Sequence, residues 1–209
     1  MNILIESTYA GPIAWYQLLF KAEAVTFDQH EHFVKASYRN RCRIASPNGV
    51  LTLSVPIENG RNKQQVINDV RIHNTQSWQS LHWQSICTAY RRSPFFEYYE
   101  DDLHAFYHTT YDSLWSFNTD LFVWIAAKLG KELNYDFSKK YESESETDKK
   151  DFRSAVHTNP KKDQSAVLVS PIVYRQVFEE KTGFLPNLSI FDLLFAEGPN
   201  AGALLQGSM

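Results

Sequence analysis

The sequence predicts an α/β protein with a mixed β-sheet, an N-terminal βαβ unit and an antiparallel hairpin, covered by several helices. Three observations predict this fold class: an apolar–helical–apolar order in the first 28 residues, an arginine-rich stretch that alternates with period two, and helical periodicity after Asn74. The chain has 209 residues, of which 43% are hydrophobic and 22% charged. A chain of this length and composition can bury one sizeable core.

The N-terminal unit is predicted as a strand at 2–6, a helix at 12–22 and a strand at 24–28. Pro12 suits the first turn of a helix. Such a crossover makes the two strands parallel and places the loop 7–11 at the carboxyl end of the first strand, where anionic ligands commonly bind. No GxGxxG or GxxxxGK[ST] motif is present, so a plain turn is the favoured interpretation of each loop residue taken singly.

A hairpin follows, with Asn48-Gly49 as its predicted turn. Alternate side chains of a strand share a face, so Arg39, Arg41 and Arg43 are predicted to project together, about 7 Å apart. These cations repel one another unless carboxylates or a bound anion lie among them, and the guanidinium fork suits oxyanions. Two interpretations stay open: an anion site, and a solvated face whose arginines pair with surface acids. The local pattern alone slightly favours the second.

A further strand is predicted at 66–72, and three helices follow it. Residues at helical spacing share the buried faces: Trp78, His82, Ile86 and Ala89 in the first, Tyr99, Leu103, Phe106 and Thr110 in the second, and Leu114, Asn118, Leu121 and Ile125 in the third, which closes at Gly130.

Periodicity disappears at 139–165, where Glu-Ser repeats and lysine-rich runs predict a loop or a locally disordered segment. The predicted organisation is therefore an α/β core domain at 1–138, this charged segment, and a C-terminal helical segment at 166–209 that packs on the core.

The C-terminal segment is predicted to contain two helices. The first starts at Ser170-Pro171 and stops at Gly183, and the last is capped by Ser189 and Asp192 and ends at Gly198.

Charge and cysteine content narrow the function classes. The net charge of -3 lacks the basic excess of a general nucleic-acid binder. Two cysteines and an N-terminus without a secretory pattern predict a cytoplasmic location. The longest strongly apolar stretch, 121–127, is too short to cross a bilayer.

Two residues are candidates for catalysis. His82 lies among apolar neighbours, where a partly buried imidazole titrates near neutrality, but a core histidine bonded to a backbone carbonyl fits the same pattern and is the usual explanation. Asp28 ends the second strand, where it can orient a hydroxyl, bind a metal or act as a base, and a turn cap explains it equally well. His30-Glu31-His32 lacks a third zinc ligand, so no metal site is predicted. No cofactor is identified.

Five blocks occur in order along the chain: 35–44, Leu53-Ser-Val-Pro56, 68–72, Trp78 with His82, and 89–99. Together they resemble the WbqC-like family of bacteria, over roughly residues 1 to 130. The family takes its name from genes in O-antigen and other surface-polysaccharide clusters, so the resemblance implies a role near modified sugars and not a particular reaction.

The sequence also departs from the family pattern. Members often carry Gln-Pro-x-Tyr-x-Pro after the first strand, whereas this chain has Glu6-Ser-Thr-Tyr9-Ala-Gly-Pro12. If the missing glutamine contacts the ligand in other members, two alternatives stay open: this chain binds a different ligand, or Ser7 and Thr8 replace the glutamine. Cys42 stands where asparagine is common.

Two function hypotheses follow. In the first, the protein is a cytoplasmic transferase that moves an acyl or aminoacyl group on a nucleotide-linked or other modified sugar in surface-polysaccharide biosynthesis. In the second, it is a non-catalytic ligand-binding or assembly protein of the same pathway. The predicted partner is a small anionic or sugar-nucleotide ligand, with no nucleic acid and no membrane span, and the oligomeric state stays open. The candidate residues are His82 and Asp28 for catalysis, and Tyr9, Arg39, Asn40, Arg41, Arg43 and Tyr90 for ligand binding.

Overall fold

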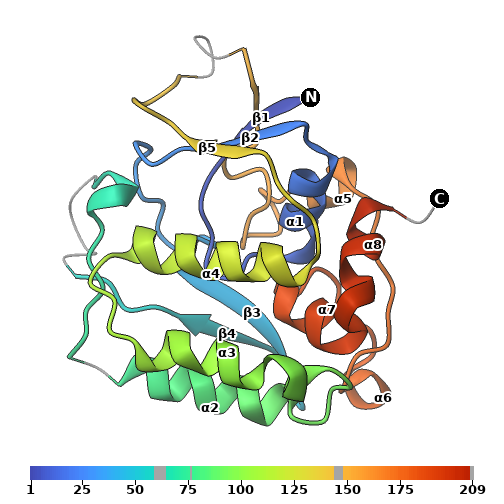
Figure 1. The fold of residues 1–209 in the computed structure, drawn as a ribbon. Helices are drawn as coiled ribbons and strands as arrows, with labels where there is room; N and C mark the ends of the chain where they lie inside the picture. Colours follow the sequence, from blue (N-terminus) through green and yellow to red (C-terminus); the bar gives the residue numbers. More distant parts are fainter. Residues whose placement is uncertain (59–64, 76, 144–147, 208–209) are drawn as a thin grey trace.

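The computed structural model describes residues 1–58, 65–75, 77–143 and 148–207. Its N-terminal unit consists of strand β1 (Asn2–Ile5), helix α1 (Ile13–Lys21) and strand β2 (Ala24–Phe27), which confirms the predicted βαβ unit (Figure 1). β1 and β2 pair in parallel along their whole length. α1 begins directly after Pro12, whose fixed φ suits the start of a helix.

Two further parallel strands complete this sheet. β5 (Tyr135–Phe137) pairs with β2 and β6 (Lys150–Asp151) pairs with β1, so the strand order is β5-β2-β1-β6. The parallel strands and the hairpin therefore lie in two separate sheets. Because parallel strands end at the same edge, the residues that follow β1, β2, β5 and β6 lie close together.

The hairpin consists of β3 (Arg41–Ser46) and β4 (Gly49–Ser54), paired antiparallel along their whole length. Its two-residue turn is Pro47-Asn48, one residue earlier than predicted. Gly49 instead begins β4 with a φ of 103°, a left-handed conformation that glycine adopts without a steric penalty.

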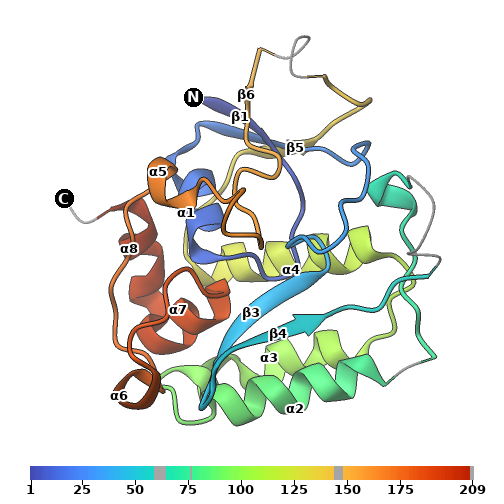
Figure 2. The ribbon, with the colours of Figure 1, turned by 180° about the vertical axis from the view of Figure 1, so that it is seen from behind.

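Three long helices follow as predicted: α2 (Trp78–Tyr90), α3 (Phe96–His108) and α4 (Leu114–Lys128). α2 and α3 pack side by side below the hairpin, and α4 crosses between the hairpin and the parallel sheet (Figure 1, Figure 2). Thr110, predicted on the buried face of the second helix, lies beyond its end and is exposed.

The strand predicted at 66–72 does not form, and this prediction is wrong. The segment contains a 3₁₀ turn, η1 (Ile67–Asp69), flanked by isolated bridges. Ile67 and Val70 are fully buried, at the three-residue spacing that a 3₁₀ turn places on one side, and η1 packs against α4. Packing against a helix therefore decides the conformation of these apolar residues.

The helix predicted from Ser170-Pro171 is also wrong for most of its length. Only α6 (Glu179–Thr182) forms before the stop at Gly183. Tyr174 and Gln176 lie on one side of an extended chain and bond the buried Asp192, at 2.5 and 3.1 Å. This polar pattern has period two, which an extended chain provides and a helix does not. Asp192, predicted as a cap, serves as their acceptor.

The remaining C-terminal elements cover α1. Ser189 accepts a hydrogen bond at the start of α7 (Ile190–Glu197), which ends at Gly198 as predicted. η2 (Gly198–Asn200) and α8 (Ala201–Gln206) follow it. α7 and α8 both pack against α1, which is therefore buried on nearly all sides.

The charged segment 139–165 contains more structure than a loop. It includes β6, and the short helix α5 (Ser165–Leu168) begins at its last residue. Phe152 and Val156 are buried in the core. Two apolar residues among charged ones produce no period, so the sequence does not reveal them. Residues 144–147 lie outside the described part of the chain, and the division into three regions stays a prediction.

Candidate functional site

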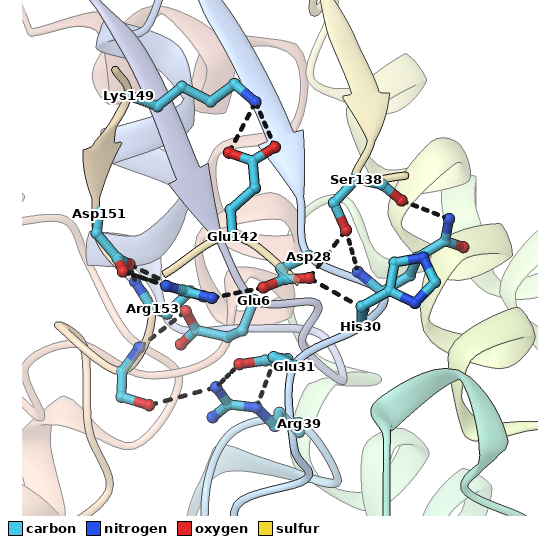
Figure 3. Close-up of polar contacts among 12 residues, drawn as sticks. Glu6, Asp28, His30, Glu31, Arg39, Ser138, Glu142, Lys149, Asp151 and Arg153 are labelled. Carbon is cyan, nitrogen blue, oxygen red and sulfur yellow. Dashed lines mark hydrogen bonds and ion pairs between the residues drawn. The ribbon is translucent and has the colours of Figure 1, made fainter. Parts of the chain in front are cut away.

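A cluster of buried charges lies at the carboxyl edge of the parallel sheet (Figure 3). Asp28 directly follows β2, and the guanidinium of Arg153 lies 2.5 Å from its carboxylate. The Ser138 hydroxyl and the His30 backbone N–H donate to the other oxygen of Asp28, at 2.8 and 2.9 Å. Arg153 also pairs with Asp151 at 2.5 Å. Both oxygens of the candidate base Asp28 therefore have protein partners.

A second ion pair in the cluster joins Arg39 and Glu31. Arg39 is 1% exposed, and its Nε and Nη2 donate to the two Glu31 oxygens at 2.7 and 2.5 Å. Nη2 also lies 3.3 Å from the Ser154 hydroxyl. Burial raises the pKa of Glu31, and the Arg39 guanidinium opposes that shift. Burying either charge without its partner would cost on the order of several kcal/mol, so each partner makes the burial of the other possible.

Glu6 is a member of this cluster that the sequence does not single out as a candidate. It directly follows β1, is 1% exposed and accepts a hydrogen bond from the Ser154 backbone N–H at 3.0 Å. Among the described residues, no cation lies within ion-pair distance of it. Burial raises the pKa of Glu6 to about 7, although Arg39 lowers it. A carboxyl that exchanges its proton near neutral pH suits general acid–base chemistry.

Arg41 and Arg43, on β3, line a groove of about 400 Å³. Among the described residues neither arginine forms an ion pair, and the buried Nε of Arg41 has no hydrogen-bond partner. Arg43 makes one long contact, 3.5 Å from the Tyr38 hydroxyl. The opposite wall provides hydroxyl and amide groups from Thr158 and Asn159. Two unpaired guanidiniums beside neutral donors form a surface that suits an oxyanion.

The predicted row of three arginines is therefore divided between two places. Arg41 and Arg43 share a face, since the buried Cys42 alternates with them. Arg39 precedes β3 in a turn and points inward to Glu31, so its predicted place on the strand is wrong. A bound ligand at Arg39 stays a prediction.

Tyr9 and His82 meet in the core. The Tyr9 hydroxyl lies 3.0 Å from Nδ1 of His82 and 2.8 Å from the Tyr107 hydroxyl, and all three side chains are buried. Burial lowers the pKa of His82 to about 4, against the effect of a hydrogen bond to the Ser54 backbone, so the ring is neutral at pH 7. These contacts fit a core histidine that holds Tyr9 in place. A role of His82 as a base stays a prediction.

Asn40 and Tyr90 fasten the hairpin to its surroundings. Asn40 Nδ2 donates to the Val55 carbonyl at 2.9 Å, and the Tyr90 hydroxyl accepts from the Ala45 backbone N–H at 3.1 Å. Tyr90 is fully buried. Neither side chain belongs to the walls of the groove of Arg41 and Arg43.

Six of the eight candidates thus fall into three sets of contacts, namely the charged cluster, the groove and the Tyr9–His82 pair, and Asn40 and Tyr90 belong to none of them. Two residues that hold the cluster together, Arg153 and Ser154, come from the segment predicted as a loop. An arginine after a two-residue strand carries no sequence signal. Glu6 could have been found, because it follows β1 as Asp28 follows β2.

Within 1–58, 65–75, 77–143 and 148–207, no three His, Cys, Asp or Glu side chains gather as a metal site requires. The described helices also include none that is long and apolar enough to cross a membrane.

Comparison with known proteins identifies the family. The model of the WbqC-like protein family matches residues 7–166, which include the groove and all of the charged cluster except Glu6. No curated protein and no solved structure matches the chain. The family match covers well over half of the sequence and extends the resemblance of the first 130 residues through Arg153 and Ser154. The chain belongs to the WbqC-like protein family.

Proposed function

We propose that this protein is a transferase that acts on a nucleotide-linked sugar and binds the phosphates of that ligand in the groove of Arg41 and Arg43. The observation that carries the proposal is the pair of guanidiniums without carboxylate partners in the described structure. Their groove of about 400 Å³ falls within the usual size range of small-molecule sites. The family resemblance, with its origin in surface-polysaccharide gene clusters, supports a sugar as the rest of the ligand.

The proposed reaction is the transfer of an acyl or aminoacyl group to a hydroxyl or amino group of the sugar. The attacking group must lose a proton as the new bond to the carbonyl carbon forms, and the bond from that carbon to the donor's leaving group, such as the thiol of an acyl thioester, breaks. We assign the proton transfer to the carboxyl of Glu6, which takes the proton from the attacking group and returns it to the leaving group, because its pKa of about 7 keeps both protonation states populated at neutral pH.

The two catalytic candidates from the sequence act as positioning residues in this proposal. Asp28 holds Arg153, from which the chain continues to the groove wall at Thr158. His82 holds Tyr9 through a hydrogen bond in the core. Neither role requires the residue to touch the ligand.

A second function, ligand binding or assembly without chemistry, is favoured by a different observation. Glu6, Asp28 and His82 are all buried and none of them lines the groove of Arg41 and Arg43, so none contacts a ligand there in this conformation. In this function the groove binds the same ligand and no product forms.

Binding is tested by calorimetric titration of UDP-, GDP- and dTDP-glucose into wild-type protein and into Arg43→Ala. We expect at least one ligand to bind and Arg43→Ala to weaken it by about 10–100-fold, the usual worth of a charge-assisted hydrogen bond. Arg175→Ala is the matched control, because this arginine is 87% exposed and, among the residues that the structure describes, pairs with a glutamate that is also exposed. Equal binding by wild type and Arg43→Ala, or no binding by any of the three, would contradict the proposal.

The same ligands distinguish the two functions. After incubation with acyl thioesters and aminoacyl donors, mass spectrometry detects an acylated sugar nucleotide if the protein is a transferase. In that case Glu6→Gln should lower turnover by about 10²–10⁴-fold while the affinity is retained. Binding without any product supports the non-catalytic function.

A further inference from the structure

A second, smaller pocket lies beside the charged cluster, where β1, β2 and β5 end. Its cavity measures about 10 Å³, or about 220 Å³ with the solvent-open space at its mouth included. Polar groups come from the chain after β1, from α1 and from α4, and three phenylalanine rings complete the wall. The wall residues that matter for recognition are Ser7, Thr8, Trp15 and Asn118.

Each of these four side chains carries a buried polar atom without a partner. The atoms are Ser7 Oγ, Thr8 Oγ1, Trp15 Nε1 and Asn118 Oδ1, and they are four of the nine such atoms in the described residues. All four side chains belong to buried residues, with at most 5% of their surface exposed. Buried polar groups are normally hydrogen-bonded, so this concentration in one pocket indicates a group that is bound there in the working protein.

The chemistry of the four atoms specifies that group. The two hydroxyls can donate or accept, the indole N–H only donates, and the amide oxygen only accepts. The orientation of the Asn118 amide is fixed, because its Nδ2 donates to the Arg39 carbonyl at 2.8 Å. No charged side chain lines the pocket. The matching ligand group is therefore neutral and able both to donate and to accept, as a hydroxyl is.

Size and shape lead to the same conclusion. A cavity of about 10 Å³ holds one water-sized group, and a hydroxyl has that size. Gly11 passes close to Thr8, so a Cβ at this position would lie 2.4 Å from the Thr8 hydroxyl oxygen. A side chain here would push Thr8 out of place.

The rings of Phe27, Phe122 and Phe137 provide an apolar wall at the pocket, which suits the C–H face of a sugar.

The pocket is linked to the arginine groove through Arg39. The Arg39 carbonyl accepts the hydrogen bond from Asn118 in the pocket wall, and Arg41, two residues further along the chain, lines the groove. The pocket and the groove are therefore connected by one short chain segment, residues 39–41.

We propose that this pocket is a subsite that receives one hydroxyl group of the sugar, a proposal that rests on the proposed binding of a nucleotide-linked sugar. In the free protein a water molecule takes the place of that hydroxyl. The water can bond all four atoms, since it donates two hydrogen bonds and accepts two. A sugar hydroxyl has the capacity for three: it donates to Asn118 Oδ1 and accepts from Trp15 Nε1 and from the Thr8 hydroxyl.

Paired titrations with UDP-glucose and with UDP test the subsite separately from the groove. Thr8→Val keeps the shape of the side chain and removes the hydroxyl. It should therefore lower the affinity for UDP-glucose by about 5–15-fold and change the affinity for UDP by less than about twofold. Thr88→Val, at an exposed position on α2, is the matched control and should change neither. Arg43→Ala should weaken both ligands, since UDP retains the phosphates.

The outcomes separate the two proposals. If Thr8→Val leaves the ratio of the two affinities unchanged, the subsite is wrong, whatever Arg43→Ala does. If Arg43→Ala does not change the affinity for UDP, the proposal that the groove binds the phosphates is wrong. The four mono-deoxy analogues of UDP-glucose identify the hydroxyl, since the correct analogue should bind wild type and Thr8→Val equally.

If no nucleotide sugar binds, free D-glucose decides the question. Binding of D-glucose that Thr8→Val weakens by about 5–15-fold supports the subsite without the groove. A crystal structure of the protein in D-glucose with a dry or collapsed pocket, or with only water in it and the sugar absent, overturns the subsite.

Discussion

The charged cluster and the arginine groove use the same residue type in opposite ways. In the cluster, Arg39 is 1% exposed and forms two hydrogen bonds to Glu31. In the groove, Arg41 and Arg43 are half-buried, and among the described residues they have no carboxylate partner. Arg39 and Arg41 are separated by only Asn40, so the difference comes from what lies opposite each side chain.

This difference indicates which charges maintain the fold and which can bind a ligand. A buried pair that loses one member leaves the other charge without water or a partner, which is strongly destabilising. A half-buried guanidinium without a partner can bind an anion without first breaking an ion pair. The cluster should therefore govern stability, and the groove should govern affinity.

The largest effect is expected from Arg39→Met. This change leaves Glu31 buried beside Glu6 without its cation and should lower the free energy of unfolding by about 3–5 kcal/mol. Arg41→Met, the matched control two residues away, should cost less than about 1 kcal/mol. Urea denaturation at pH 7 measures both. Equal losses would remove the distinction between cluster and groove.

The next effect concerns Glu6 and depends on pH. Its pKa is raised from 4.5 to about 7 in the folded protein, so the folded state keeps a proton that the unfolded chain loses above pH 4.5. Wild type is therefore penalised progressively as the pH rises from 4.5 to 7, by about 3 kcal/mol at the upper end. The penalty is absent below pH 4.5, where both states carry the proton.

Glu6→Gln removes the ionisable group and retains an acceptor for the Ser154 backbone N–H. The variant should unfold like wild type at pH 4 and be more stable by about 3 kcal/mol at pH 8. Denaturation curves at the two pH values check this expectation. If the difference in stability between Glu6→Gln and wild type is the same at pH 4 and at pH 8, Glu6 does not titrate between these two pH values. Arg39 and Glu31 face Glu6, and their opposing effects on its titration are already part of the pKa of about 7.

A smaller effect is expected from His82→Gln. The loss of the buried hydrogen bond to Tyr9 should lower the free energy of unfolding by about 1–3 kcal/mol, and the affinity for UDP-glucose should not change. His32→Gln, at an exposed position, should have no measurable effect on either. If His82→Gln leaves the melting temperature unchanged and lowers turnover by about 10²–10⁴-fold, the histidine is the base and Glu6 is not.

The sequence predicted those parts of the fold that depend on local periodicity. The βαβ unit, the hairpin and α2, α3 and α4 each carry several apolar residues at one period. The predictions for 66–72 and 170–178 were wrong because contacts with distant residues determine the conformation of these segments. η1 packs against α4, and Tyr174 donates a hydrogen bond to Asp192. β6 is two residues long and carries no pattern at all.

In the candidate site, too, local patterns predicted some residues and distant contacts determined the rest. Strand alternation identified Arg41 and Arg43, and the end of a strand identified Asp28. The ion pair that buries Arg39 could not be predicted, because Glu31 lies in an irregular loop eight residues earlier. Ser7 and Thr8 were visible only as a departure from the family pattern, and their missing hydrogen bonds are visible only in three dimensions.

The most direct test of the account is a calorimetric titration of inorganic pyrophosphate into three proteins at low salt. Wild type and Arg175→Ala should bind one pyrophosphate with equal affinity, and Arg41→Ala should bind it about 10–100-fold more weakly with an unchanged melting temperature. Pyrophosphate binding that is the same in Arg41→Ala as in wild type would show that the unpaired arginines of β3 are not the anion site.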